Sequence, residues 1–306
     1  MALHRLTTIT IGVPNVAETA AYYTEFGLTP CGEADFTTVD GGEQLRIVNA
    51  PTRRLVELGV GADDPDDLHR IASRLAGLGA AHTLDDQQLT TTDPGTAVKV
   101  VITPSERITR EPAPAPTYNG PGRTERVDAR AQAVLRATPV QPRKLGHVVL
   151  GSTDHEASHR FFTDGLGFKV SDEAPGVAAF LRCSSDHHNV LLQPAPVRFL
   201  HHTSWEVEDV DEIGRGAHRM LEGHPERHIW GLGRHHIGSN FFWYLKDPAG
   251  NFSEYYSDLD CILDDAVWKP EAFDDMRMIY NWGPPVPASF IAPDDLAALM
   301  TGMHNT

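Results

Sequence analysis

The sequence has few cysteines, with only Cys31, Cys183 and Cys261 in 306 residues. An odd number of widely spaced cysteines in a chain of this length does not suit a disulfide framework. We therefore expect three buried thiols in a reducing cytoplasm, a compartment that also suits ferrous iron.

Positive charge is also scarce, because 26 lysines and arginines stand against 42 aspartates and glutamates, for a formal net charge of -16. Such a chain repels polyanions, so nucleic acid is not an expected partner. The sequence contains no apolar run of about 18 residues, and its amino terminus has no basic segment followed by an apolar core. We expect a soluble cytoplasmic protein without a membrane span.

Two stretches that lie 139 residues apart resemble each other. Residues 9–28 and 148–168 each combine a β-branched strand, an Asn or Asp turn, and a short helix with an aromatic pair that ends at glycine. A strand followed by a helix recurs at 54–60 with 66–78, and at 203–207 with 210–221. The order predicts an α+β protein built by internal duplication.

A proline-rich stretch from Glu111 to Arg143 separates the two copies and predicts a linker with a short helix near 127–135. We place an N-terminal domain at 1–136, which includes most of this linker, and a C-terminal domain at 137–306. The tail from Leu259 onward is too aromatic for a disordered extension.

Histidines are concentrated in the second copy, where 12 of the 16 fall between positions 147 and 236. The 139-residue offset puts Thr8 opposite His147, and the first copy offers no histidine to match His202 and no glutamate to match Glu254. These three residues lie on separate predicted strands, and side chains from neighbouring strands can converge on one face. Two imidazoles and a carboxylate suit Fe(II), Mn(II) or Zn(II).

From about Leu145 to Asp258 the chain resembles the catalytic domain of the type I extradiol catechol dioxygenases, within the vicinal oxygen chelate superfamily. The resemblance is carried by these segments: Gly146-His147-Val148-Val149, His188-Asn189-Val190, Leu200-His201-His202-Thr203, Gly233-Arg234-His235, Tyr244, and Asp247-Pro248-Ala249-Gly250-Asn251-Phe252-Ser253-Glu254. The spacing of His235, Tyr244 and Glu254 around the Asp-Pro-Ala-Gly turn is the most specific part.

The resemblance implies duplicated βαβββ modules whose mixed sheets form cup-shaped half-barrels, with the first copy degenerate. It implies Fe(II), with Mn(II) as the alternative, held by His147, His202 and Glu254, and a catechol and O2 as substrates. It gives His188 an acid–base role, for which His187 is the competing residue. A homo-oligomer is implied as well.

Further residues take their expected roles from the resemblance or from local pattern. His235 and Tyr244 match the pair that hydrogen-bonds the bound substrate. Strand alternation predicts that His201 points away from His202 and is structural. Trp205 is expected in the core, and His224, His228 and His236 are expected in solvent.

The sequence leaves two other functions and the substrate open. A glyoxalase-type lyase or isomerase would use a similar ligand set with Zn or Ni, and a non-enzymatic sequestering protein would use the same cavity without metal. Plain, alkyl or aryl, and carboxylated catechols are all compatible substrates. The segment Ala266 to Pro287 is expected to bound the pocket, with these aromatic residues available to it or to the core: Trp268, Phe273, Tyr280 and Trp282.

Overall fold

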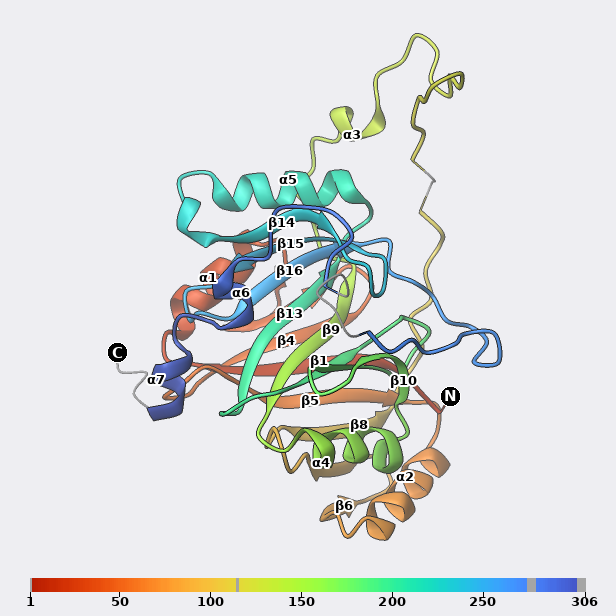
Figure 1. The fold of residues 1–306 in the computed structure, drawn as a ribbon, viewed down its shortest axis with the longest axis vertical. Helices are drawn as coiled ribbons and strands as arrows, with labels where there is room; N and C mark the ends of the chain where they lie inside the picture. The colour runs from red at the N-terminus through yellow and green to blue at the C-terminus, as the bar shows by residue number, and fades with distance from the viewer. Residues whose placement is uncertain (1, 114–115, 274–278, 302–306) are drawn as a thin grey trace.

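The computed structural model describes residues 2–113, 116–273 and 279–301, which form two similar halves (Figure 1). The first half comprises β1 (Leu3–Val13), α1 (Val16–Glu25), β2 (Thr29–Pro30), β3 (Asp35–Thr38), β4 (Gly42–Asn49), β5 (Arg54–Ala62), α2 (Pro65–Gly77), β6 (His82–Leu84), β7 (Leu89–Thr92) and β8 (Lys99–Pro104). The second half comprises β9 (Lys144–Ser152), α4 (His155–Arg160) with a π-helical continuation (Phe161–Leu166), β10 (Lys169–Ala174), β11 (Ala178–Arg182), β12 (Val190–Pro194), β13 (Phe199–Glu206), α5 (Val210–Leu221), β14 (His228–Arg234), β15 (Phe241–Lys246) and β16 (Phe252–Ser257).

The linker carries α3 (Gln132–Leu135), and the tail carries α6 (Ala288–Ile291) and α7 (Leu296–Thr301). Figure 1 shows the linker as an arm that projects from the body of the molecule. Residues 114–115 of the predicted linker and 274–278 of the predicted pocket-bounding segment lie outside the described residues. The boundary between domains at 136 and 137 stays a prediction.

Each half is one mixed eight-stranded sheet, and the two sheets have the same strand order. The orders are β2-β3-β4-β1-β5-β8-β7-β6 and β10-β11-β12-β9-β13-β16-β15-β14. In each sheet the two central strands are antiparallel to each other, and each pairs in parallel with the last strand of its own βαβββ unit. The predicted α+β fold of duplicated βαβββ modules is therefore confirmed.

The helices begin where the sequence supplies a capping carboxylate. The side chains of Asp64, Asp154 and Asp209 each accept a hydrogen bond from a backbone N–H in the first turn of α2, α4 and α5. Such caps satisfy donors that have no partner within the helix. The predicted helix at 210–221 matches the bounds of α5.

The first half packs against the back of β16 and shares one apolar core with the second half. The Tyr22 hydroxyl lies 2.6 Å from Ser253 Oγ. The Tyr255 hydroxyl donates to the Phe26 carbonyl at 2.5 Å, and the two rings stack with centroids 3.9 Å apart. Because side chains alternate along a strand, Glu254, which lies between Ser253 and Tyr255, faces the side of the sheet away from the first half.

A second brace from the first half is Arg53, whose side chain is fully buried. Its guanidinium donates to the Leu200 carbonyl just before His201, to Asn251 Oδ1 at 3.4 Å, and to both carboxylate oxygens of Asp295 at 2.5 and 2.8 Å. One side chain of the first half thus joins β13, the turn before β16 and the tail.

Exposure of single residues corrects one prediction and confirms others. Cys183 is buried, but Cys31 and Cys261 are exposed, because they lie in an edge turn and in the tail rather than under a sheet. Trp205 is in the core as predicted, and the three histidines predicted in solvent, His224, His228 and His236, are exposed. Among the described helices, none is both long and apolar enough to cross a membrane.

Replacing Arg53 with Met should lower the free energy of unfolding by about 3 kcal/mol, because the Leu200 carbonyl and the Asp295 carboxylate lose a buried cationic donor. Urea unfolding followed by tryptophan fluorescence measures this. Arg54→Met, at the exposed next position, should change stability by less than about 0.5 kcal/mol. Equal values for the two variants would contradict the bracing role of Arg53.

Candidate metal centre

His147, His202 and Glu254 come from three adjacent strands and point to the same face of the second sheet. In the strand register, Ser204 of β13 stands opposite His147 on β9 and opposite Glu254 on β16. His202 lies two residues before Ser204 and therefore shares its face. The pairing of β9, β13 and β16 thus brings together three side chains that are far apart in the sequence.

The potential ligand atoms of these residues form a small triangle. The Nε2 atom of His147 lies 3.3 Å from His202 Nε2 and 3.1 Å from Glu254 Oε2, and the third side of the triangle is 3.7 Å. All three side chains are buried. Of the His, Cys, Asp and Glu groups in the described part of the chain, this is the one whose ligand atoms are close enough to hold an ion.

The triangle fits a divalent cation on two grounds. Its sides are close to the separation of about 3 Å between neighbouring ligands whose bonds to a metal are about 2.1 Å long. In addition, Oε2 of Glu254 is buried without a hydrogen-bond partner among the described residues, a state that is costly for a carboxylate oxygen. Two imidazoles and one carboxylate on one face, with the other side open, are typical of mononuclear non-haem iron sites.

The charge states of the group suit cation binding. Burial by itself would raise the pKa of Glu254, but His147 and His235 beside it hold that pKa well below its usual range, so the carboxyl is ionised. Burial, aided by the neighbouring His201, places the pKa of His202 well below the usual histidine value. A neutral imidazole keeps a lone pair for a metal.

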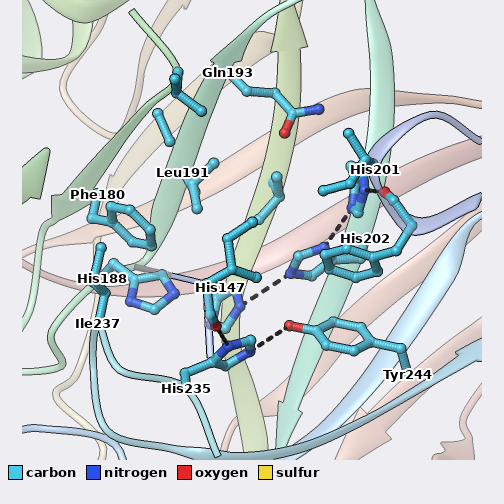
Figure 2. Close-up of a pocket in the computed structure, with 16 residues that line it drawn as sticks. His147, Phe180, His188, Leu191, Gln193, His201, His202, His235, Ile237 and Tyr244 are labelled. Atoms are coloured by element: carbon cyan, nitrogen blue, oxygen red, sulfur yellow. Dashed lines mark hydrogen bonds between the residues drawn. The ribbon is translucent and has the colours of Figure 1, made fainter. Parts of the chain in front are cut away.

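The position of His201 corrects the alternation prediction, because its ring lies in the same cavity as His202 (Figure 2). The pairing of β13 with β9 shifts register between Leu200 and His202. This bulge at His201 adds one residue, so the two consecutive histidines no longer point to opposite faces.

His201 fixes the orientation of the His202 ring. Burial lowers the pKa of His201 to about 4, so its ring is neutral. Its Nε2 donates to the Phe290 carbonyl at 2.6 Å, because a carbonyl can only accept. Its Nδ1 is then an acceptor, and it lies 2.7 Å from His202 Nδ1, which must donate. The Nε2 lone pair of His202 is thereby left for the triangle.

Of the two candidates for the acid–base role, His188 lines the cavity and His187 lies behind it. The His188 ring centroid is 4.2 Å from that of His147. Burial, with His147 and His187 beside it, places the pKa of His188 well below the usual value, so the ring is a neutral base. The Nδ1 atoms of His187 and His188 are 3.1 Å apart.

His235 and Tyr244 lie side by side and are joined by a hydrogen bond (Figure 2). His235 Nδ1 donates to the Ile279 carbonyl, which leaves Nε2 to accept from the Tyr244 hydroxyl at 2.9 Å. Burial and the nearby Glu254 raise the pKa of Tyr244 well above its usual value, so the hydroxyl keeps its proton. Tyr244 also stands opposite Glu254 in the strand register, which gives it the same face.

One cavity of about 170 Å³ is lined by His147, His188, His201, His202, His235 and Tyr244, and the rest of its described wall is mostly apolar. The other lining residues are Val149, Val177, Ala178, Phe180, Leu191, Gln193, Ile237, Ile279, Phe290 and Ile291. The sequence analysis did not identify these residues. Alternation along a strand nevertheless puts Ala178 and Phe180 on one face of β11, and Leu191 and Gln193 on one face of β12.

The tail closes the cavity in part through the expected segment 266–287, which contributes Ile279 but none of its four aromatic residues. Ile279, Phe290 and Ile291 line it. Trp268 instead packs on His187, Tyr280 packs on Trp230, and Trp282 is exposed beside Phe241. Phe273 packs on the exposed His236. Which aromatic residue reaches the cavity depends on how the tail folds back over the sheet, and the local sequence does not encode this.

The first sheet carries the same scaffold without these donors. Ile9 and Val148 begin the equivalent parallel pairings, which places Thr8 at the position of His147. By the same register, Glu57 stands where His202 is and Val101 where Glu254 is. The predicted absence of the three ligands from the first copy is confirmed for these positions.

Residues 144–255 match the family model described as the Glyoxalase/Bleomycin resistance protein/Dioxygenase superfamily. The chain is 32% identical to "Metapyrocatechase 2" of Cupriavidus necator over 305 residues, which covers 95% of this chain and 92% of that protein. It is 36% identical over 121 residues to an "Iron-dependent extradiol dioxygenase" of Rhodococcus jostii, covering 35% of this chain and 40% of that protein.

Among solved structures, the Mn(II)-bound glyoxalase from Novosphingobium aromaticivorans superposes with a TM-score of 0.73 at 25% identity, covering 93% of this chain and 94% of that one. The similarity to the metapyrocatechase spans nearly the whole of both chains. The chain therefore belongs to the type I extradiol catechol dioxygenases of the vicinal oxygen chelate superfamily.

Proposed function

We propose that this enzyme uses O2 to open the ring of a catechol beside its two hydroxyls, at a ferrous ion held by His147, His202 and Glu254. The observation that carries the proposal is the buried triangle of ligand atoms with His188, His235 and Tyr244 around the same cavity. The near full-length similarity to a metapyrocatechase supports the reaction class.

The donor set fits iron, and one relative is named as iron-dependent while a structural neighbour binds Mn(II). When bound, the ion supplies redox chemistry and open coordination positions at which a diol and O2 can meet. We propose Fe(II) as the resident metal, with Mn(II) as the alternative that the same ligands accept.

The side chains around the cavity supply proton transfer and orientation. His188 is neutral, and its Nε2 has no hydrogen-bond partner among the described residues, so this atom can accept a proton from a catechol hydroxyl and later return it. Tyr244 keeps its proton, and because its one hydrogen is donated to His235 Nε2, its oxygen can accept a hydrogen bond from a hydroxyl of the bound substrate. His235 fixes the place of the Tyr244 hydroxyl.

The wall of the cavity indicates the class of catechol. Phe180, Leu191, Val177 and Ile291 present apolar surface, and the lining residues that the structure describes include no lysine or arginine. We propose a catechol whose ring substituent is absent or apolar, because a buried carboxylate without a cationic partner would be costly.

Two earlier expectations stay predictions. The cytoplasmic location rests on the sequence composition, and the homo-oligomer rests on the family resemblance.

Addition of Fe(II) or Mn(II) under anaerobic conditions should raise the melting temperature of the metal-free protein by about 5 °C, because only the folded chain assembles the triangle. Differential scanning fluorimetry and metal analysis after desalting measure this. His202→Ala and Glu254→Ala should bind no metal and show no shift. His236→Ala, at an exposed histidine, should behave as the unaltered protein, and a shift retained in His202→Ala would refute the ligand assignment.

Anaerobically iron-loaded enzyme should consume one O2 per catechol and form a yellow product, which an oxygen electrode and visible absorbance detect together. His188→Ala should keep its iron and lower kcat by about 10²-fold or more, the usual effect of removing a general acid–base group. Conversion of a hemithioacetal without O2 uptake would favour a glyoxalase. Stoichiometric binding of a small molecule without turnover would favour a sequestering protein.

The ratio kcat/KM should be up to about tenfold higher for 3-methylcatechol than for catechol, because the methyl group enters an apolar wall. The carboxylated 3,4-dihydroxybenzoate should be the poorest of the three. Initial rates of O2 uptake give these ratios. Preference for the carboxylated ring would show that the substrate class is wrong while leaving the reaction class intact.

A further inference from the structure

A chain of buried polar groups runs from β10 to the cavity through two consecutive histidines. Asp172 Oδ2 lies 2.9 Å from His187 Nε2, and His187 Nδ1 lies 3.1 Å from His188 Nδ1. All three side chains are buried, and His187 is fully so. Neither Asp172 nor His187 belongs to the ligand triangle or hydrogen-bonds the Tyr244 hydroxyl. The burial of these two polar side chains therefore needs a different explanation.

The direction of each hydrogen bond in this chain follows from its first member. A carboxylate only accepts, so His187 donates from Nε2 to Asp172. The other oxygen of Asp172 accepts from the Glu271 backbone N–H at 2.7 Å, which keeps the carboxylate in place. With this one hydrogen on its ring, His187 has a bare Nδ1. Because two bare nitrogens 3.1 Å apart would repel, the hydrogen between them belongs to His188 Nδ1.

We propose that Asp172 and His187 are positioning residues that hold His188 with Nδ1 protonated and Nε2 bare toward the cavity. The opposite tautomer would present an N–H to the substrate and could not accept its proton. This inference rests on the acid–base role proposed for His188, and it adds what sets that residue in its working form.

The packing around His187 leaves little freedom for another arrangement. Its ring makes T-shaped contacts with the rings of Trp268 and Phe180, whose centroids are 5.4 and 6.1 Å away. Its backbone N–H donates to the Asp260 carbonyl at 2.9 Å. Phe180 stands opposite Asp172 in the strand register and lines the cavity. The tail beyond β16 therefore encloses the chain of hydrogen bonds from outside.

The substitution Asp172→Asn tests the proposal by reversing the hydrogen-bond direction. The Glu271 N–H retains the amide oxygen, so the amide nitrogen faces His187 and donates to its Nε2. His187 must then carry its hydrogen on Nδ1 and donate to His188, whose hydrogen moves to Nε2. We expect kcat to fall by about 10²-fold while KM and iron content stay within twofold.

Glu173→Gln is the matched control, because Glu173 is the next residue on the same strand and also pairs with a histidine, His159, at 3.0 Å but near the surface. It should leave kcat unchanged. In a His188→Ala background, Asp172→Asn should cause no further loss, since its effect passes through His188. If Asp172→Asn folds poorly, His187→Phe is the second variant. It removes His187 Nδ1, the acceptor of the hydrogen bond from His188, while keeping a ring of similar volume. We expect the same fall in kcat.

The tautomer is also measured directly, by long-range ¹H–¹⁵N correlation spectra of the full-length protein labelled in histidine and loaded with Zn²⁺. The His188 signals, identified by their loss in His188→Ala, should show a protonated Nδ1 in the unaltered protein and a protonated Nε2 in Asp172→Asn. An unchanged tautomer, an unchanged kcat, or an equal loss in the His188→Ala background would overturn the proposal. Absence of any dioxygenase activity would refute the proposed function instead, and the spectra would still decide the hydrogen-bond direction.

Discussion

The burial of the Glu254 carboxylate is the constraint on which the rest of this structure depends. An ionised group without solvent costs several kcal/mol unless charge or hydrogen bonds compensate it. Here His147 and His202 approach one oxygen, and Asn240 donates to the other at 3.2 Å. A cation at the triangle completes this compensation, so the same arrangement that stabilises the fold also creates an open site for chemistry.

The first half of the chain explains how that arrangement is kept rigid. Its own sheet carries Thr8, Glu57 and Val101 at the positions of the three ligands, so it lacks the donor set of the second half. Instead Tyr22 and Phe26 pack behind Glu254 through the residues on either side of it, and Arg53 ties β13 to the turn and the tail. Duplication has produced one half for the reaction and one half for support.

The paired histidines show one device used twice. His201 stands behind His202, and His187 stands behind His188, each with its outer nitrogen on an acceptor that cannot donate. A directional hydrogen bond at the outer end fixes which nitrogen of the inner ring is bare. In one pair the bare nitrogen faces the cation site, and in the other we infer that it faces the substrate. The tail supplies the Phe290 carbonyl and the Glu271 N–H, and so takes part in both.

The sequence by itself determined the duplicated α+β fold, because strand and helix periodicity are local properties, and its resemblance to the extradiol dioxygenases grouped six residues into one expected site. It also located the metal-binding half from the unequal histidine distribution. Only the tertiary structure decided that His201 shares the cavity, that Asp172 stands behind His187, and that Ile279, Phe290 and Ile291 close the wall. A bulge shifts the facing of every residue beyond it, and the path of a tail depends on contacts with distant strands, so neither is encoded in a local pattern. The two exposed cysteines follow the same rule, since burial belongs to the packed chain and not to the residue type.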